Sequence, residues 1–117
     1  MAKNLFILNE APYGTERSYN ALRLAGALLK RPGEELRIFL MGDAAACAKA
    51  NQKVPPGYYN IADMLGMILR RSGQVAVCGS CMDARGIGAD DLVAGAERGS
   101  MDILSTWTAE ADKVIVF

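Results

Sequence analysis

Two of the three cysteines in this 117-residue chain, Cys78 and Cys81, lie three residues apart and are followed by Arg85. On one turn of helix this spacing brings both sulfurs to the same face, where a disulfide or a resolving step is possible. The thiolate is the reactive form of cysteine, and a helix start or a nearby cation favours it. We therefore predict a reactive thiol at Cys78, a second thiol at Cys81 and a stabilising cation at Arg85. Arg70 or Arg71 could add further positive charge.

The elements that must position these residues alternate between strand and helix along the chain. Apolar runs predict strands at residues 5–8, 36–41, 74–78 and 114–117. Helical spacing predicts helices at residues 15–30, 44–50, 58–71 and 100–111, with Thr15 and Ser100 as N-caps. Residues 79–84 read as a turn or a short helix, and residues 90–96 as either helical or extended. Cys78 then ends the third of these strands, at the sheet edge where ligands and reactive groups collect in α/β proteins.

Alternating strands and helices predict an α/β protein, and near-continuous apolar strands predict a sheet covered on both faces. We expect a single three-layer α/β/α domain over residues 1–117, with a mainly parallel five-stranded sheet. A hydrophobic share of 51% against a charged share of 22% agrees with one compact core.

The composition also excludes several classes of function. Thirteen Lys and Arg residues balance thirteen Asp and Glu residues, so direct nucleic-acid binding is not expected. Histidine is absent, which rules out a Ser-His-Asp triad and imidazole metal ligands. We predict no metal and no cofactor, no membrane segment, and a cytoplasmic location with free thiols. Cys47 lies in an Ala-rich segment and reads as a small packed side chain outside the site.

Several motifs together resemble the DsrE/DsrF-like family. They are Val-x-Val-Cys, then Gly-Ser-Cys-Met-x-x-Arg-Gly-Ile, then Asp-Leu-x-x-Gly-x-x-x-Gly-Ser-Met, and a terminal Ala-Asp-Lys-Val-Ile-Val-Phe. The similarity spans nearly the whole chain and is most specific over residues 75–117. Members are small α/β/α proteins that assemble as homotrimers, homohexamers or heterohexamers. Several carry sulfur in sulfur oxidation or in the relay for tRNA thiolation.

The resemblance implies a role for Cys78. In the carriers, the persulfide forms on a cysteine at the end of a strand, and this cysteine lies seven residues before the Arg of an Arg-Gly pair. Cys78 lies at the same distance before Arg85. Sulfur-transferring subunits of the relay have one cysteine in this segment, whereas this chain adds Cys81, which would let a persulfide discharge as a disulfide. The resemblance thus implies a homo-oligomeric sulfur-handling protein with sulfur donor and acceptor partners.

Two other functions stay open from the residues alone. One is a non-catalytic, oligomeric binding or assembly module whose cysteines are structural. The other is a dithiol redox protein that uses Cys78 and Cys81 as its redox pair. Thioredoxin-like enzymes, however, place their Cys-x-x-Cys motif near the first strand and have a proline loop later in the chain. Here the motif follows the third predicted strand, and no proline comes after Pro56.

Overall fold

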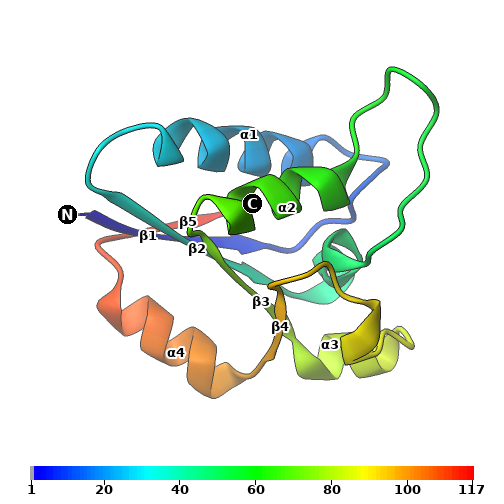
Figure 1. Ribbon diagram of the computed structural model, residues 1–117. Helices are drawn as coiled ribbons and strands as arrows, with labels where there is room; N and C mark the ends of the chain where they lie inside the picture. The colour runs from blue at the N-terminus through cyan, green and yellow to red at the C-terminus, as the bar shows by residue number, and fades with distance from the viewer. Residues whose placement is uncertain (1) are drawn as a thin grey trace.

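A computed structural model describes residues 2–117, which form strands and helices in regular alternation (Figure 1). The strands are β1 (Ala2–Leu8), β2 (Glu34–Leu40), β3 (Gln74–Cys78), β4 (Glu97–Gly99) and β5 (Lys113–Val116). The α-helices are α1 (Arg17–Leu29), α2 (Ile61–Arg70), α3 (Gly79–Ala84) and α4 (Met101–Glu110), and two 3-10 helices are η1 (Gly42–Ala48) and η2 (Ala89–Asp91). The predicted α/β architecture is confirmed.

All five strands form one sheet in the order β4-β3-β2-β1-β5. Every neighbouring pair is parallel, so the sheet is wholly rather than mainly parallel. The register places Cys78, the last residue of β3, opposite Gly99, the last residue of β4. The carboxyl ends of these two strands therefore lie side by side.

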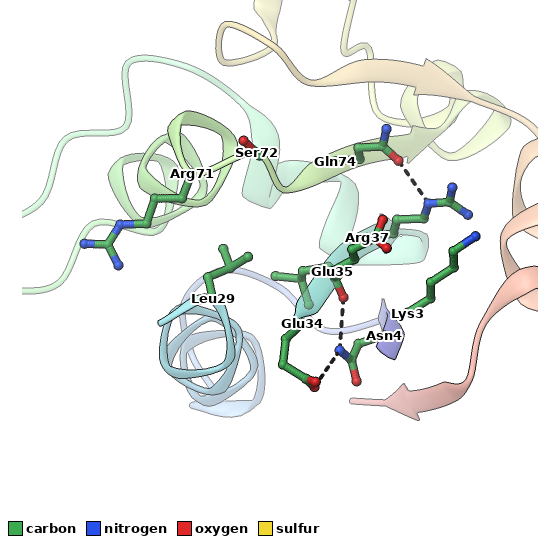
Figure 2. Close-up of a pocket in the computed structure, with 10 residues that line it drawn as sticks. Lys3, Asn4, Leu29, Glu34, Glu35, Arg37, Arg71, Ser72 and Gln74 are labelled. Atoms are coloured by element: carbon green, nitrogen blue, oxygen red, sulfur yellow. Dashed lines mark hydrogen bonds between the residues drawn. The ribbon is translucent and has the colours of Figure 1, made fainter. Parts of the chain in front are cut away.

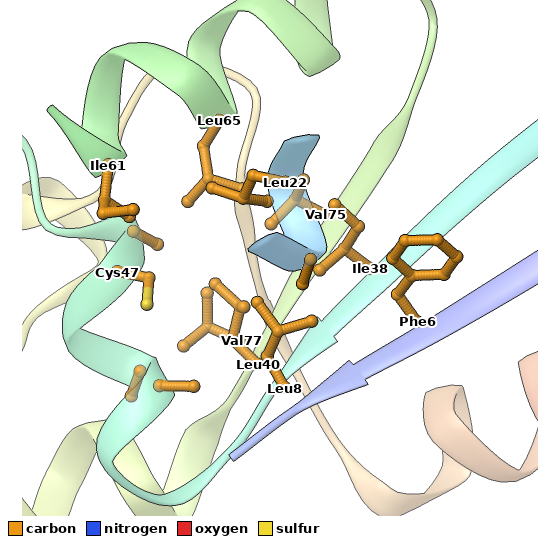
Figure 3. Close-up of a cluster of buried hydrophobic side chains, with 14 of the residues drawn as sticks. Phe6, Leu8, Leu22, Ile38, Leu40, Cys47, Ile61, Leu65, Val75 and Val77 are labelled. Atoms are coloured by element: carbon orange, nitrogen blue, oxygen red, sulfur yellow. The ribbon is translucent and has the colours of Figure 1, made fainter. Parts of the chain in front are cut away.

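The two faces of the sheet have separate cores. Helices α1 and α2 cover one face and α4 lies against the other (Figure 1). Because side chains alternate along a strand, Val75 and Val77 point to the α1/α2 side while Ala76 and Cys78 point to the α4 side. The larger core, shown in part in Figure 3, includes Phe6, Leu8, Leu22, Ile38, Leu40, Cys47, Ile61, Leu65, Val75 and Val77. The smaller core consists of Leu5, Phe39, Ala76, Cys78, Leu104 and Trp107.

The connections of the sheet explain where a reactive group belongs. From β1 to β4 each strand lies beside its predecessor, and α4 then carries the chain back across the other face to β5, beyond β1. The segment after β3 packs Met82 into the α1/α2 core, whereas the segment after β4 packs Leu104 into the α4 core. Connections that leave adjacent strands toward opposite faces open a crevice at their carboxyl ends, where α/β proteins bind ligands.

Some predicted boundaries are wrong. The helix expected from residue 58 begins at Ile61, because Asn60 caps it by accepting a hydrogen bond from the Asp63 amide at 3.0 Å. The Tyr13 hydroxyl also accepts from the Ile61 amide at 3.1 Å. Thr15 is not the N-cap of α1, which starts at Arg17 after Glu16 with no side-chain cap.

Other local predictions are confirmed in full or in part. Ser100 is confirmed as the N-cap of α4, accepting from the Ile103 amide at 3.3 Å. The segment expected to be helical at residues 44–50 is the 3-10 helix η1, and residues 79–84 do form a short helix, α3. The segment left open at residues 90–96 is mostly irregular, and β4 follows it. No helix within residues 2–117 is long and apolar enough to cross a bilayer.

Candidate functional site: a thiol pair at the end of β3

Cys78 occupies the junction between the sheet and α3. It is the last residue of β3 and the N-cap residue of α3, so its side chain leaves a rigid strand just where the backbone turns into a helix. The thiol packs on the α4 side with Phe39, Leu104 and Trp107 and is 7% exposed. It is therefore largely buried, but it is not sealed from solvent.

Cys81 lies one turn later and is half-buried between the two cores. Its sulfur accepts a hydrogen bond from the backbone amide of Gly42 at 3.1 Å. Gly42 follows β2 in the sequence, so this bond ties α3 to the end of the neighbouring strand. Cys78 and Cys81 are both free thiols.

The two thiols differ in acidity. Partial burial opposes ionisation of Cys78, but hydrogen bonds from the Cys81 thiol, the Ser80 side chain and the amides of both residues outweigh it and lower the pKa of Cys78. The Cys78 sulfur and the Ser80 hydroxyl oxygen are 3.4 Å apart. The same hydrogen bond with Cys78, together with burial, raises the pKa of Cys81. The geometry thus suits Cys78 as the thiolate and Cys81 as the thiol that donates to it.

Arg85 lies on the Cys81 side of this pair. Its guanidinium donates to the Cys81 carbonyl oxygen at 3.1 Å and forms an ion pair with Asp43 at 2.8 Å. Its charge lowers the pKa of Cys81, although the hydrogen bond with Cys78 and burial prevail there. The structure thus places the predicted cation next to the second thiol rather than next to Cys78.

The expectation that Arg70 or Arg71 adds charge near Cys78 is wrong. Both residues stand where α2 ends and the chain turns into the start of β3. Arg71 lines a hollow of about 290 Å³ with Lys3, Asn4 and Gln74, at the amino ends of the strands (Figure 2). Cys78 lies at the opposite end of β3, so this hollow and the thiol pair are separate features.

Arg98 was not expected from the sequence, although its guanidinium lies against Gly79, the residue that follows Cys78. It belongs to β4, pairs in register with Val77, and its guanidinium forms two bonds of 2.9 Å with the Asp83 carboxylate. A methyl group on Gly79 would come within 2.8 Å of that guanidinium, so Arg98 lies directly against the first residue of α3. The bonds with Asp83 raise the pKa of Arg98 most, and the charge of Cys78 adds to the same effect.

Cys47 is a core residue, in agreement with the sequence. It is fully buried in η1, and burial raises its pKa to about 12. No group of three or more His, Cys, Asp or Glu side chains within residues 2–117 has the arrangement of a metal site.

Comparisons with known proteins place the chain in a family. The model of the DsrE/DsrF-like family matches residues 2–117. Protein YchN of Escherichia coli is 42% identical over 118 residues, covering all of both chains, and an uncharacterized protein of Methanopyrus kandleri, MK0008, is 39% identical over 95% of this chain and 90% of its own. The crystal structure of YchN superposes with a TM-score of 0.94, covering both chains fully. A protein of Methanobacterium thermoautotrophicum, MTH1491, shares the fold at a TM-score of 0.77 with 12% identity over the full length of both chains. This chain belongs to the DsrE/DsrF-like family.

Proposed function

We propose that this protein carries sulfur as a persulfide on Cys78. The observation that carries the proposal is the pair of free thiols with opposite pKa shifts at the end of β3, lowered for Cys78 and raised for Cys81. A thiolate attacks sulfane sulfur, so the more acidic thiol is the acceptor. Membership in a family that is associated with sulfur relay supports the same assignment.

The transfer needs no outside oxidant or reductant. The Cys78 thiolate attacks the outer sulfur of a donor persulfide, R–S–SH, and the S–S bond of the donor breaks. The donor leaves as the thiolate R–S⁻ with the electron pair of that bond, and Cys78 becomes Cys78–S–SH. An acceptor thiolate then attacks the outer sulfur in the same way and regenerates the Cys78 thiolate.

Cys81 offers a second way out of the persulfide. Its thiolate can attack the inner sulfur of Cys78–S–SH, which releases HS⁻ and leaves a disulfide between the two cysteines. The raised pKa of Cys81 opposes this step near neutral pH and so favours carriage over discharge. The same disulfide would be the working state of a dithiol redox protein, which is the second candidate function.

Donor and acceptor are proteins or small persulfides that reach the end of β3, and we propose that several copies of this chain assemble, as a trimer or a hexamer. The α4 side of the sheet supports assembly because it leaves apolar side chains exposed. Met101 is 61% exposed, Val114 43% and Val116 62%. A non-catalytic assembly module would use the same face without chemistry at Cys78, and a cytoplasmic location would keep the thiols reduced.

Mass spectrometry of the intact protein after incubation with inorganic polysulfide separates these functions. A sulfur carrier gains one or more sulfur atoms, loses the gain in Cys78→Ser, and keeps it in the matched control Cys47→Ser. A dithiol redox protein instead loses two hydrogen atoms as Cys78 and Cys81 join. If the folded protein shows neither change, both chemical functions are wrong and the assembly module remains.

A further inference from the structure

We propose that the groove between α1 and α2 binds an acidic amphipathic helix of another protein. Apolar side chains and three cations line this groove, and the two helices lie side by side over one face of the sheet (Figure 1). The Cys78 thiol faces α4 on the other side of the sheet. The inference therefore goes beyond sulfur carriage, because a helix docked between α1 and α2 does not contact Cys78 and needs no chemistry there.

Two stripes of residues, one from each helix, form the walls of the groove. The members of each stripe recur at steps of three or four residues, so they lie along the same side of their helix. Seven residues separate the first member of each stripe from the last, which is two turns or about 11 Å at 1.5 Å per residue. The walls are Arg23, Ala27 and Lys30 from α1, and Met64, Met67 and Arg71 from α2 and its C-cap.

The floor of the groove is apolar, and a glycine keeps it open. Leu22 and Ile68 are buried at its base, and Gly26 also lines it. A Cβ added to Gly26 would meet nothing within 4 Å, so the space above this residue is empty. The cavity has a volume of about 320 Å³. Met67 is 48% exposed, and its flexible side chain suits an apolar surface that adapts to a partner.

All the charged side chains of the groove are positive. No carboxylate within residues 2–117 forms an ion pair with Arg23, Lys30 or Arg71. Arg23 lies at one end, where it donates to the Asn20 side chain at 3.1 Å and sits 5.5 Å from the centre of the Tyr19 ring. Lys30 and Arg71 are the C-cap residues of α1 and α2 and lie at the other end. Figure 2 shows the Arg71 side chain directed away from the other residues of the hollow at the amino ends of the strands.

The acidic residues of the same layer do not neutralise these cations. α1 contains no Asp or Glu, and Asp63 is the one carboxylate of α2. Asp63 lines a different hollow, together with Arg70. Glu34 begins β2, and its carboxylate accepts from the Asn4 amide at 3.2 Å. The groove therefore has a positive charge that an acidic partner would complement.

The shape and the charge together select a helix as the occupant. A trough with an apolar floor and a cation at each end fits a helix that has apolar residues in the middle of one side and carboxylates two turns apart. Such carboxylates have the same spacing as Arg23 and Lys30, about 11 Å. The acidic helix of this chain, α4, would fit poorly in a second copy. Ser105 lies in the middle of its exposed side, and Glu110 is bonded to Arg37 at 2.6 Å.

The test uses a synthetic peptide of about 20 residues, long enough to form a helix on its own. It carries Glu residues two turns apart, with Leu residues between them on the same side, and a fluorescent label reports binding by anisotropy. We expect saturable binding to the parent protein that weakens as salt is added. A peptide with Lys in place of the Glu residues, and one with Ser in place of the Leu residues, should each bind about tenfold more weakly or less.

Variants of the protein place the peptide in the groove. Gly26→Leu fills the cavity and keeps every charge, so affinity should fall about tenfold, whereas Ala109→Leu adds the same kind of side chain on the exposed side of α4 and should bind like the parent. Lys30→Glu should weaken the Glu peptide and strengthen the Lys peptide. The matched control Arg31→Glu changes the neighbouring exposed residue, which does not line the groove, and should have a smaller effect.

Circular dichroism identifies a variant that does not fold, and if Gly26→Leu is one, the exchange of preference in Lys30→Glu decides. The proposal is overturned if the parent does not bind the Glu peptide, or if folded Gly26→Leu binds it as the parent does. It is also overturned if light scattering shows that Gly26→Leu changes the number of associated copies while Ala109→Leu does not, because the groove is then a contact between copies. Sulfur gain from polysulfide at Cys78 is a separate measurement, so failure of the carrier function and failure of the docking groove are distinguishable.

Discussion

Cys47 and Cys78 lie in two different regions near the carboxyl ends of the strands, Cys47 in η1 and Cys78 at the end of β3. Both side chains are more than nine-tenths buried, with exposures of 0% and 7%. Their pKa values nevertheless move in opposite directions. Burial raises the pKa of Cys47 to about 12, against a weaker opposing effect from Ser18, whereas the hydrogen bonds around Cys78 outweigh its burial and lower its pKa. Low exposure alone therefore does not make a thiol inert.

The surroundings of the two sulfurs explain the difference. Cys47 lies among apolar side chains in η1, and its thiol donates to the Glu10 carbonyl oxygen at 3.8 Å, a contact that stabilises the protonated form. Cys78 instead faces donors, including the amides at the start of α3 and the Cys81 thiol. Donors stabilise a thiolate and acceptors stabilise a thiol, so the hydrogen-bonding groups around each sulfur decide its chemistry.

The largest expected effect is on selective alkylation. With a pKa of about 12, Cys47 carries about one thiolate in ten thousand near pH 8, and it must also open to reach the reagent. We expect iodoacetamide to modify Cys78 in the native protein roughly a thousandfold faster than Cys47, and both at similar rates in urea. Peptide mass spectrometry over time measures the ratio. Comparable native rates would show that the contrast between the two environments is wrong.

The next effect is on alkaline stability. The thiol of Cys47 has a pKa of about 12 in the folded protein against 9.0 for an ordinary cysteine. The folded state therefore binds more protons between these values, and stability falls as pH rises through that window. From near pH 8 to about pH 11, the parent should lose about 2.5 kcal/mol more free energy of unfolding than Cys47→Ala. Urea unfolding at both pH values measures the difference.

Cys78→Ala is the matched control for that experiment. In the parent the pKa of Cys78 is lowered in the folded state, so its effect on stability has the opposite sign to that of Cys47. The ionised Cys78 thiol stabilises the fold above its pKa in the folded state. The Cys78→Ala variant should therefore lose at least as much free energy of unfolding as the parent over the same pH range. If the free energy of unfolding depended on pH equally in the parent and in Cys47→Ala, burial would not raise the pKa of Cys47, and this prediction would be wrong.

The sequence predicts much of this framework for a physical reason. Apolar runs mark strands that are buried on both faces, and periodic apolar residues mark α1, α2 and α4, so the sheet and its covering helices follow from local patterns. Cys78 and Cys81 follow too, because their spacing and their place after an apolar run are both local features.

Arg98 could not be predicted in the same way. Its strand, β4, is three residues long, and Glu97 and Arg98 are exposed, so it has no apolar pattern to recognise. Its position next to Gly79 arises only from pairing with β3. Arg85 attracted the prediction because it is close in sequence, but the helical path of α3 directs it to the carbonyl of Cys81, four residues before it. Residue spacing within one segment cannot predict contacts that form only when two strands pair.

The smallest expected effect separates the individual hydrogen bonds around Cys78. In Cys81→Ala the thiol donor is lost, so the pKa of Cys78 should rise and its alkylation at neutral pH should slow by about two- to threefold. Cys81→Ser retains a donor at the same position and should lie closer to the parent. Ser80→Ala removes a contact of 3.4 Å that lowers the pKa of Cys78 less than the Cys81 thiol does, so it should slow the reaction less than Cys81→Ala. If Ser80→Ala has the larger effect, the hydroxyl rather than the second thiol stabilises the Cys78 thiolate, and Cys81 would then act only when a persulfide is discharged.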